Sequence, residues 1–319
     1  MIDLEFLCIE DYLQGLTKLD IYATQISPGS FSCRHREFQL PKLTVGDRSI
    51  NTSLLFQAAM NKDYFYIILP KNQGTGVSVN GKPLRINQPL VFSDNQDMLV
   101  IIPSNYPKYC VIVISSEELA KSYGTENIGI LKKALKKESH EKIIFSHVGG
   151  NLNHLNLIIE SLLNQGGSLT YQAVMDVQET IIGLLSNLLK ISSLTPKLNN
   201  IKYRRQFTIV TRALNYIHKK SVIIITVPEL AKASCCCVRN LEYSFKAIIG
   251  MTPKQYIIKR RLQLIHSTLK KKNTKSIAEL TKAYGVVNQG RFAQDYFKFF
   301  NEYPHQTRDI QAEGSNHQE

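Results

Sequence analysis

The sequence predicts an α+β fold in which a β-rich N-terminal domain and a helical extension precede an all-α C-terminal domain. Short apolar stretches separated by turn residues dominate as far as residue 115, and helical periodicity dominates after it. The charge is uneven, because residues 201–308 hold 21 basic and 5 acidic side chains, a net of +16, while the rest of the 319 residues carries −3. This asymmetry favours a phosphate-binding domain joined to one with another role. The expected boundaries are 1–115 for the β-rich domain, 116–190 for the helical extension, 191–202 for a linker, 203–310 for the all-α domain and 311–319 for a polar tail.

The N-terminal domain is predicted from strands at the spacing typical of an all-β sandwich or barrel. Asn80-Gly81 predicts a hairpin between two strands, because a type I′ turn needs positive φ at both central residues. A second turn is expected at residues 94–97. The predicted strands are 53–60, 64–69, 76–79, 90–92, 98–102 and 110–114.

The helical extension begins at residues 116–119, which resemble a helix N-terminus, and continues through 131–137 and 171–190. In the last helix, apolar side chains repeat every three or four residues, as in a heptad pattern. This stripe packs either against the preceding barrel or against the same helix of a second chain, and both alternatives stay open. The candidate dimer-interface residues are Val174, Val177, Ile181, Leu184 and Leu188.

The basic segment begins with a short helix, a turn and a longer helix. Thr226 is placed to cap the first helix, Pro228 occupies its first turn, and a turn follows at residues 234–236. The second helix runs from about residue 237 to 249 and stops at Gly250. Its apolar residues fall on one face and its polar residues on another, which is the arrangement that places a helix in the major groove of DNA. The predicted inward residues are Leu241, Phe245, Ile248 and Ile249.

The same plan recurs about fifty residues later. Residues 276–285 form a short helix and a corner, Asn288 caps the next helix, and residues 289–300 form a second candidate reading helix. Between the two units, residues 253–271 make one helix of nearly 30 Å at about 1.5 Å per residue. Successive major-groove segments on one face of DNA are about 34 Å apart, so two readers can enter both. The core face of the second reading helix is expected to be Phe292, Tyr296, Phe299 and Phe300.

About a hundred residues, covering both units in order, carry positions typical of one protein family. In the first unit they are Leu230-Ala231, Arg239, Leu241, Phe245, Gly250-Met251-Thr252-Pro253, Tyr256 and Arg261-Leu262. In the second unit they are Ile277-Ala278-Glu279, Tyr284-Gly285, Phe292, Tyr296-Phe297-Lys298, Phe300, Pro304 and Arg308. With these residues the segment resembles the DNA-binding domain of AraC-type transcription regulators.

The resemblance implies which side chains face DNA. Arg239 suits a guanine edge but also a phosphate, Glu242 suits cytosine but can instead pair with Lys246, and an exposed Gln suits adenine or makes no contact. The implied base-reading residues are Arg239, Glu242, Tyr243, Gln289, Gly290, Arg291, Ala293 and Gln294. The residues expected to neutralise phosphates are Lys246, Lys254, Lys259, Arg260, Lys275 and Lys298.

The segment departs from the family pattern in three places. Cys235 stands where the corner usually has Gly, Cys237 stands where a Ser or Thr cap is usual, and Asn301-Glu302 replaces the usual ending of the last core helix. Consecutive cysteines do not easily bridge one another, so reduced thiols are expected. Cys235, Cys236 and Cys237 are either a redox switch at a helix N-terminus or small buried residues.

For the N-terminal domain, the resemblance implies an effector-binding or dimerising role and a cupin-like barrel. His35 and Glu37 are expected to belong to a surface charge cluster, because no further ligands stand at suitable positions. His140, His147 and His154 recur every seven residues, but Gly149-Gly150 is expected to break the helix that would align them. We therefore expect no metal and no cofactor.

We expect a non-enzymatic, sequence-specific transcription regulator, because the motifs of catalytic elbows, zinc proteases and phosphate loops are missing from the sequence. The family more often activates than represses. The expected partners are double-stranded DNA and RNA polymerase, with a small-molecule effector and a homodimer as open possibilities. No apolar run approaches the ~20 residues of a membrane span, so no membrane association and a cytoplasmic location are expected. Two alternatives remain: a sensor protein whose basic region binds nucleic acid without specificity, and a redox regulator acting through the three consecutive cysteines.

Overall fold

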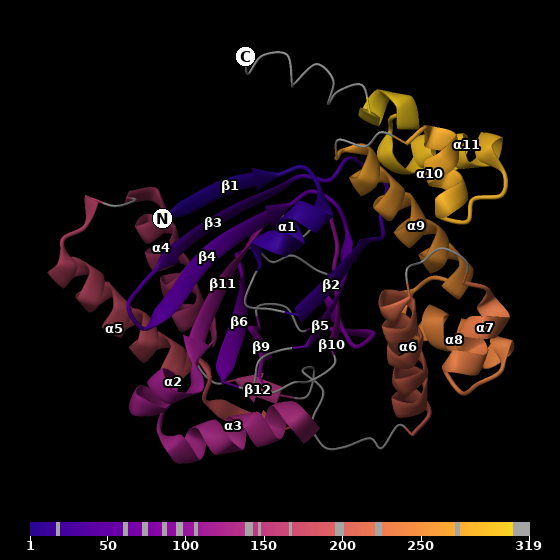
Figure 1. Cartoon of the computed structure of the whole chain (residues 1–319). Coiled ribbons are helices and arrows are strands. Elements are labelled where there is room, and N and C mark those ends of the chain that lie inside the picture. Colours follow the sequence, from indigo (N-terminus) through magenta and orange to yellow (C-terminus); the bar gives the residue numbers. More distant parts are fainter. Residues whose placement is uncertain are drawn as a thin grey trace, which may run out of the picture.

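The chain has an N-terminal β-rich part and a C-terminal helical part, as Figure 1 shows for this computed structural model. The α+β class is therefore confirmed. None of the helices in the described part of the chain is long and apolar enough to cross a membrane. The structure describes residues 1–16, 20–59, 63–71, 76–84, 88–93, 98–104, 108–137, 143–145, 148–165, 168–194, 201–220, 225–271 and 275–308.

Two antiparallel sheets face each other in the N-terminal part. The six-stranded sheet has the order β1 (Ile2–Phe6), β3 (Cys33–Gln39), β4 (Leu43–Ile50), β11 (Lys108–Ser115), β6 (Tyr64–Pro70) and β9 (Leu90–Phe92). The five-stranded sheet has the order β2 (Asp20–Gln25), β5 (Leu54–Ala59), β10 (Met98–Ile102), β7 (Ser78–Val79) and β8 (Lys82–Pro83). Apolar side chains from both sheets and from the short helix α1 (Ile9–Gly15) form the core between them.

The strands predicted from the sequence lie within two residues of observed ones. The predicted hairpin turn is also confirmed, with φ of 56° at Asn80 and 81° at Gly81. The expected turn at residues 94–97 lies outside the described residues. Four strands and a helix before residue 51 had not been predicted; they are β1, α1, β2, β3 and β4.

Four helices cover the outer face of the six-stranded sheet (Figure 1). Each contributes buried apolar side chains to a core shared with β4, β6 and β11. Ser115 accepts a hydrogen bond from the backbone N–H of Glu118 and so caps the first of these helices. The helices are α2 (Ser116–Tyr123), α3 (Thr125–Lys137), α4 (Val148–Gln165) and α5 (Tyr171–Leu188).

The apolar stripe of α5 packs against this chain's own sheet and helices. Ile181 and Leu188 have no exposed surface, so these two side chains are not available to a second chain. Val174, Val177 and Leu184 are half-buried at the edge of the same core. The periodicity was correctly interpreted as helical, but its innermost residues fill an intramolecular interface.

Two further expectations for this region need correction. Gly149 and Gly150 do not break a helix, because both lie in the first turn of α4, where a Cβ at either position would meet nothing within 4 Å. The expected linker 191–202 is partly regular structure. It contains β13 (Ile191–Leu194), which pairs with β12 (Ile143–Phe145), and the start of α6 (Ile201–Lys219). Residues 195–200 lie outside the described part.

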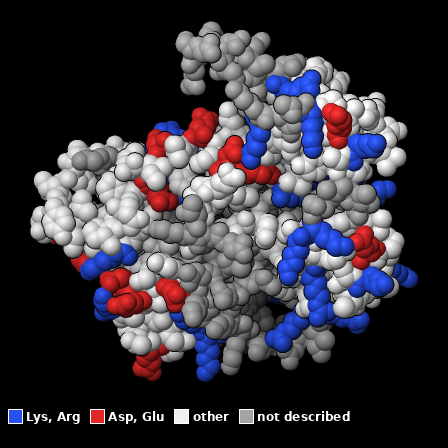
Figure 2. Space-filling model, viewed as in Figure 1, with Lys and Arg blue, Asp and Glu red and all other residues white. Residues whose placement is uncertain are grey.

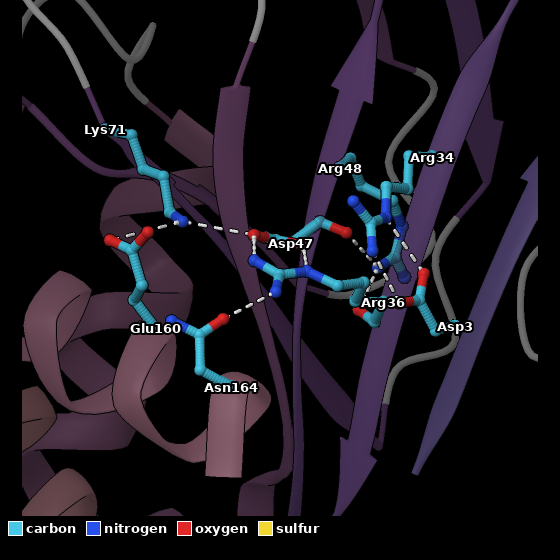
Figure 3. Close-up of polar contacts among 8 residues, drawn as sticks. All are labelled: Asp3, Arg34, Arg36, Asp47, Arg48, Lys71, Glu160 and Asn164. Carbon is cyan, nitrogen blue, oxygen red and sulfur yellow. Dashed lines mark hydrogen bonds and ion pairs between the residues drawn. The ribbon is translucent and has the colours of Figure 1, made fainter. Parts of the chain in front are cut away.

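A cluster of charges fixes α4 against β3 and β4 (Figure 3). Asp47 accepts hydrogen bonds from Arg36 and from Lys71, whose Nζ lies 3.1 Å from Asp47 Oδ2. The same cations reach the helix, since Arg36 donates to Asn164 Oδ1 at 2.8 Å and Lys71 lies 3.8 Å from Glu160. Arg36, Asp47 and Lys71 are mostly buried, so this network joins sheet and helix through paired charges.

The C-terminal part is helical, with two apolar cores. The first lies among α6, α7 (Val227–Ala233), α8 (Val238–Ile249) and the start of α9 (Pro253–Leu269); the second lies among the rest of α9, α10 (Ile277–Ala283) and α11 (Gln289–Phe300). Thr252 and Ser276 each form a capping box, and Thr226 accepts from the N–H of Glu229. The helix α9 therefore joins two helical units.

Candidate nucleic-acid interface

The first candidate reading helix, α8, presents a polar face to solvent. Its inward residues are buried as predicted, and Gly250 ends the helix with φ of 82°. Arg239, Glu242 and Tyr243 are all exposed. The Arg239 guanidinium lies 5.6 Å from the centroid of the Tyr243 ring, so both side chains occupy one face one turn apart. Lys246 is exposed, and among the described contacts Glu242 makes no ion pair with it.

The second candidate reading helix, α11, repeats this arrangement. Asn288 caps it, accepting from the backbone N–H of Arg291 at 2.9 Å. The predicted core face is buried, with Tyr296 fully enclosed, while the predicted reading face is open. Arg291 lies 3.8 Å from Asp295, an exposed pair of small energetic weight. Of the reading residues, Gln289, Gly290, Arg291 and Gln294 are exposed and Ala293 is half-buried.

The six predicted phosphate contacts fall into two groups. Lys246, Lys254, Lys275 and Lys298 are exposed. Lys259 and Arg260 are half-buried in α9 and face the N-terminal part. Lys259 donates to the carbonyl oxygen of Ile26 at 2.8 Å, and Arg260 lies 3.3 Å from Glu10. Burial lowers the pKa of Lys259. In this conformation these two cations are occupied within the chain.

The turn between α7 and α8 shows the effect of the cysteines. Cys235 adopts φ of 55°, in the left-handed region where most L-residues are strained. Cys237 is the N-cap of α8 but its thiol accepts no capping hydrogen bond. Both expected departures from the family pattern therefore have a local structural consequence.

The interpretation of these cysteines as small buried residues is wrong for two of the three. Cys235 and Cys237 are exposed, and Cys236 is half-buried. Burial and the two neighbouring thiols raise the pKa of Cys236, which opposes the low thiol pKa that a reactive cysteine needs.

One basic group near the first reading helix was not predicted. Arg204, Arg205 and Arg212 of α6 are exposed, and Arg205 is close enough to Cys236 to lower the pKa of that thiol. Arg205 therefore lies beside the turn that leads into α8. The spacing of these arginines along a predicted helix was the available signal. Figure 2 shows Lys and Arg gathered over the helical C-terminal part, with most acidic residues of this face elsewhere.

The N-terminal part offers no metal site among the described residues. His35 is buried rather than part of a surface cluster, and its Nε2 lies 3.3 Å from Glu37 Oε2. His154 lies in α4, whereas His140 and His147 lie outside the described residues. Cys8, Cys33 and Cys110 are buried free thiols.

Comparison with known proteins identifies the helical part. A family model described as a helix-turn-helix domain matches residues 230–310. Residues 230–310 are a helix-turn-helix domain of the AraC/XylS type. A XylDLEGF operon transcriptional activator of Pseudomonas putida is 34% identical over 98 residues, which span 30% of this chain and 30% of that protein. A regulatory protein HrpB of Ralstonia nicotianae is 29% identical over 108 residues, covering 33% of this chain and 21% of its own.

Solved structures of related regulators were also found. An AraC-type transcriptional regulator from Chromobacterium violaceum is 25% identical and covers 33% of this chain and 92% of its own, with a TM-score of 0.31. The AraC-like transcriptional activator CuxR is 12% identical and covers 82% and 94%, with a TM-score of 0.43.

Proposed function

We propose that the protein is a transcription activator that binds a specific duplex DNA site through α8 and α11 and contacts RNA polymerase when bound. The observation that carries this proposal is the pair of exposed polar faces on two capped helices, each backed by its own apolar core. The family of residues 230–310 supports DNA as the ligand.

The two faces supply different chemistry. The face of α8 offers the Arg239 guanidinium, a bidentate donor for guanine O6 and N7. The face of α11 offers Gln289 and Gln294, whose amides suit adenine N6 and N7. Exposed lysines around both helices, among them Lys254 and Lys298, neutralise phosphates and fix the register.

The test is selection of duplexes from a random pool by the full-length chain, followed by competition at physiological salt. A specific site is expected to bind about 10³-fold or more tighter than bulk DNA. Equal affinity for all sequences would instead establish the alternative, a basic region that binds nucleic acid without reading it.

A second role, effector sensing, is favoured by a cavity between the two sheets. Its volume is about 150 Å³, and its lining is mainly apolar, from Ile21, Phe56, Val100 and Ile102 on one wall to Val113 on the other. An engineered cavity of similar size and lining in another protein binds benzene, so this cavity can hold one small ring.

The polar end of the cavity indicates an uncharged ligand. Arg48 lies there, with Nη1 3.1 Å from the carbonyl oxygens of Arg36 and Asp47 and Nη2 3.4 Å from Glu37 Oε2. Burial raises the pKa of the neighbouring Tyr12 to about 12, so its hydroxyl stays neutral. Because Arg48 and Glu37 already balance each other, a mainly apolar molecule with one hydroxyl or carbonyl group fits best.

Benzyl alcohol is a suitable probe, with toluene as the analogue that lacks the hydroxyl. Benzyl alcohol is expected to raise the melting temperature of the full chain by about 2 °C or more at saturation, and toluene to do so less. Val113→Phe fills the cavity and removes the effect. A shift that persists in this variant would place the probe elsewhere.

A further inference from the structure

The five-stranded sheet separates the cavity from the DNA-binding domain by a single layer of backbone. Side chains alternate across a strand, so neighbouring residues face opposite sides. On β5, Phe56 lines the cavity, whereas Leu55 belongs to the core of the first helical unit. On β10, Val100 lines the cavity and Leu99 joins the same helical core.

The strand register aligns these residues into rows. Phe56 pairs with Ala23 on one side and Val100 on the other, forming an inner row. Gln57 pairs with Tyr22 and Leu99, forming an outer row. A displacement of the inner row therefore moves the outer row with it.

The outer row holds the first helical unit and the joining helix through polar contacts. Gln57 donates to Asn215 Oδ1 in α6, and the Tyr22 ring stacks on His218 with centroids 4.2 Å apart. The Thr24 hydroxyl lies 3.0 Å from the Tyr256 hydroxyl in α9. Figure 1 shows β2, β5 and β10 on the side that faces α6 and α9.

The segment that follows β2 reaches the second unit. The backbone N–H of Gly29 donates to the carbonyl oxygen of Phe299 at 2.8 Å, and the Ser30 hydroxyl donates to that of Phe300 at 3.0 Å. Both acceptors are at the end of α11. One edge of the sheet thus touches both units that carry reading helices.

We propose that the β2–β5–β10 sheet transmits occupancy of the cavity to the DNA-binding domain, by changing how α8 and α11 are held relative to each other. This inference rests on the proposed effector and DNA-binding roles and adds the route between them. Coupling between two sites is reciprocal and is typically 5–150-fold. Ligand and DNA then change each other's affinity by the same factor.

The experiment measures the Kd of the full-length chain for a DNA duplex selected as above, with and without saturating benzyl alcohol. The expected change is at least about fivefold. A change below about twofold, with benzyl alcohol bound, overturns the coupling and leaves both binding roles intact. If benzyl alcohol does not bind, the cavity assignment and the coupling fail together, while DNA binding is tested separately by competition.

A double variant of the outer row, Thr24→Val with Gln57→Leu, tests the route. It removes two polar contacts with α6 and α9 and keeps β-forming side chains in the sheet. Benzyl alcohol is expected still to raise its melting temperature, while the coupling to DNA falls below about twofold.

The matched control is Ser186→Ala, which removes a buried polar contact with Ser122 in the helical layer, on the far side of the six-stranded sheet. This control is expected to retain the full coupling. Full coupling in the outer-row variant, or its loss in the control, would show that the signal takes another route.

Discussion

At the residue scale, the exposed face of each reading helix separates side chains that read bases from side chains that only bind phosphate. Arg239 is exposed and held beside Tyr243, whereas Lys254 is an exposed cation at the start of α9. A base contact contributes to discrimination, and a phosphate contact contributes equally on every sequence.

Arg239→Ala is therefore expected to cost about 1–3 kcal/mol of discrimination between the selected site and bulk DNA, with the salt slope nearly unchanged. Gln294→Ala should behave alike at its own base pair. Lys254→Ala is expected to weaken all sequences alike and to reduce the salt slope by about one. Titrations at several salt concentrations measure both quantities, and the opposite pattern would exchange the roles of the two groups.

Cys235→Gly is expected to stabilise the protein by about 0.5–1 kcal/mol, because glycine adopts the positive φ of this corner without strain and loses only part of that gain to its freer unfolded state. Asn301→Gly is the control, since Asn301 has φ of 59° but asparagine tolerates this region better. Urea unfolding measures both variants. An equal gain in both would mean that the thiol side chain adds no strain.

The redox alternative has its own test at this scale. Replacing Cys235, Cys236 and Cys237 together by Ser is expected to leave DNA binding unchanged and equally insensitive to oxidants. Oxidant-sensitive binding in the parent chain that disappears in the triple variant would instead establish a thiol switch.

At the element scale, the Arg36–Asp47–Lys71 cluster joins α4 to the six-stranded sheet through buried charges. Asp47→Asn removes the negative partner of two mostly buried cations, which is expected to cost about 3 kcal/mol of unfolding free energy. Lys42→Ala, which breaks the more exposed Lys42–Glu179 pair on α5, is the control and is expected to cost less than about 1 kcal/mol. A comparable loss in both variants would contradict the role given to burial.

The same cluster predicts a pH dependence. Burial alone would raise the pKa of Asp47, but hydrogen bonds from Arg36 and Lys71 outweigh it and hold this pKa below the ordinary value of 3.8. The stabilisation by the Asp47 carboxylate is therefore fully present above pH 3.8 and is lost as the pH falls through the lowered pKa. Unfolding free energies of the parent chain and Asp47→Asn are expected to converge only below pH 3.8. Convergence already near pH 5 would contradict the lowered pKa.

Local signals in the sequence were enough for most elements but not for their partners. The caps at Thr226, Ser276 and Asn288 and the Asn80-Gly81 turn depend on neighbouring residues alone, and the structure has each of them. The burial of Ile181 was not predictable, because an amphipathic stripe is the same whether it packs on its own sheet or on another chain.

The missed strands have a similar cause. In β3, charged residues alternate with apolar ones, and β4 contains Gly46, Asp47 and Arg48, so neither has the usual composition of a strand. Their stability comes from long-range pairing and from α4, which the sequence alone does not show. The same limit applies to Lys259 and Arg260, since their partners lie more than 230 residues away.

At the scale of the whole molecule, the Asn80-Gly81 turn is the closest approach of the N-terminal domain to α8. A Cβ on Gly81 would lie 2.7 Å from the Cα of Ile248, and Tyr203 donates to the carbonyl oxygen of Asn80. The hairpin therefore has a backbone-to-backbone fit with the first reading helix.

Gly81→Ala is expected to lower the unfolding free energy more than Gly250→Ala does. Both positions have φ near 80°, so the strain of about 1–2 kcal/mol is shared, but a Cβ on Gly250 would meet nothing within 4 Å. Urea unfolding and amide exchange in α6 measure the difference. Equal costs in the two variants would mean that the hairpin does not press on α8 in solution.

Much of the docking of α9 onto the N-terminal domain uses peptide oxygens rather than side chains. Lys259, Gln263 and Lys270 donate to the carbonyls of Ile26, Ala23 and Leu7. Every residue type has a carbonyl, so substitutions at these three acceptor positions preserve the attachment as long as the backbone keeps its path. The sensing module is therefore free to diversify its surface chemistry over evolutionary time while remaining fastened to the same partner helix.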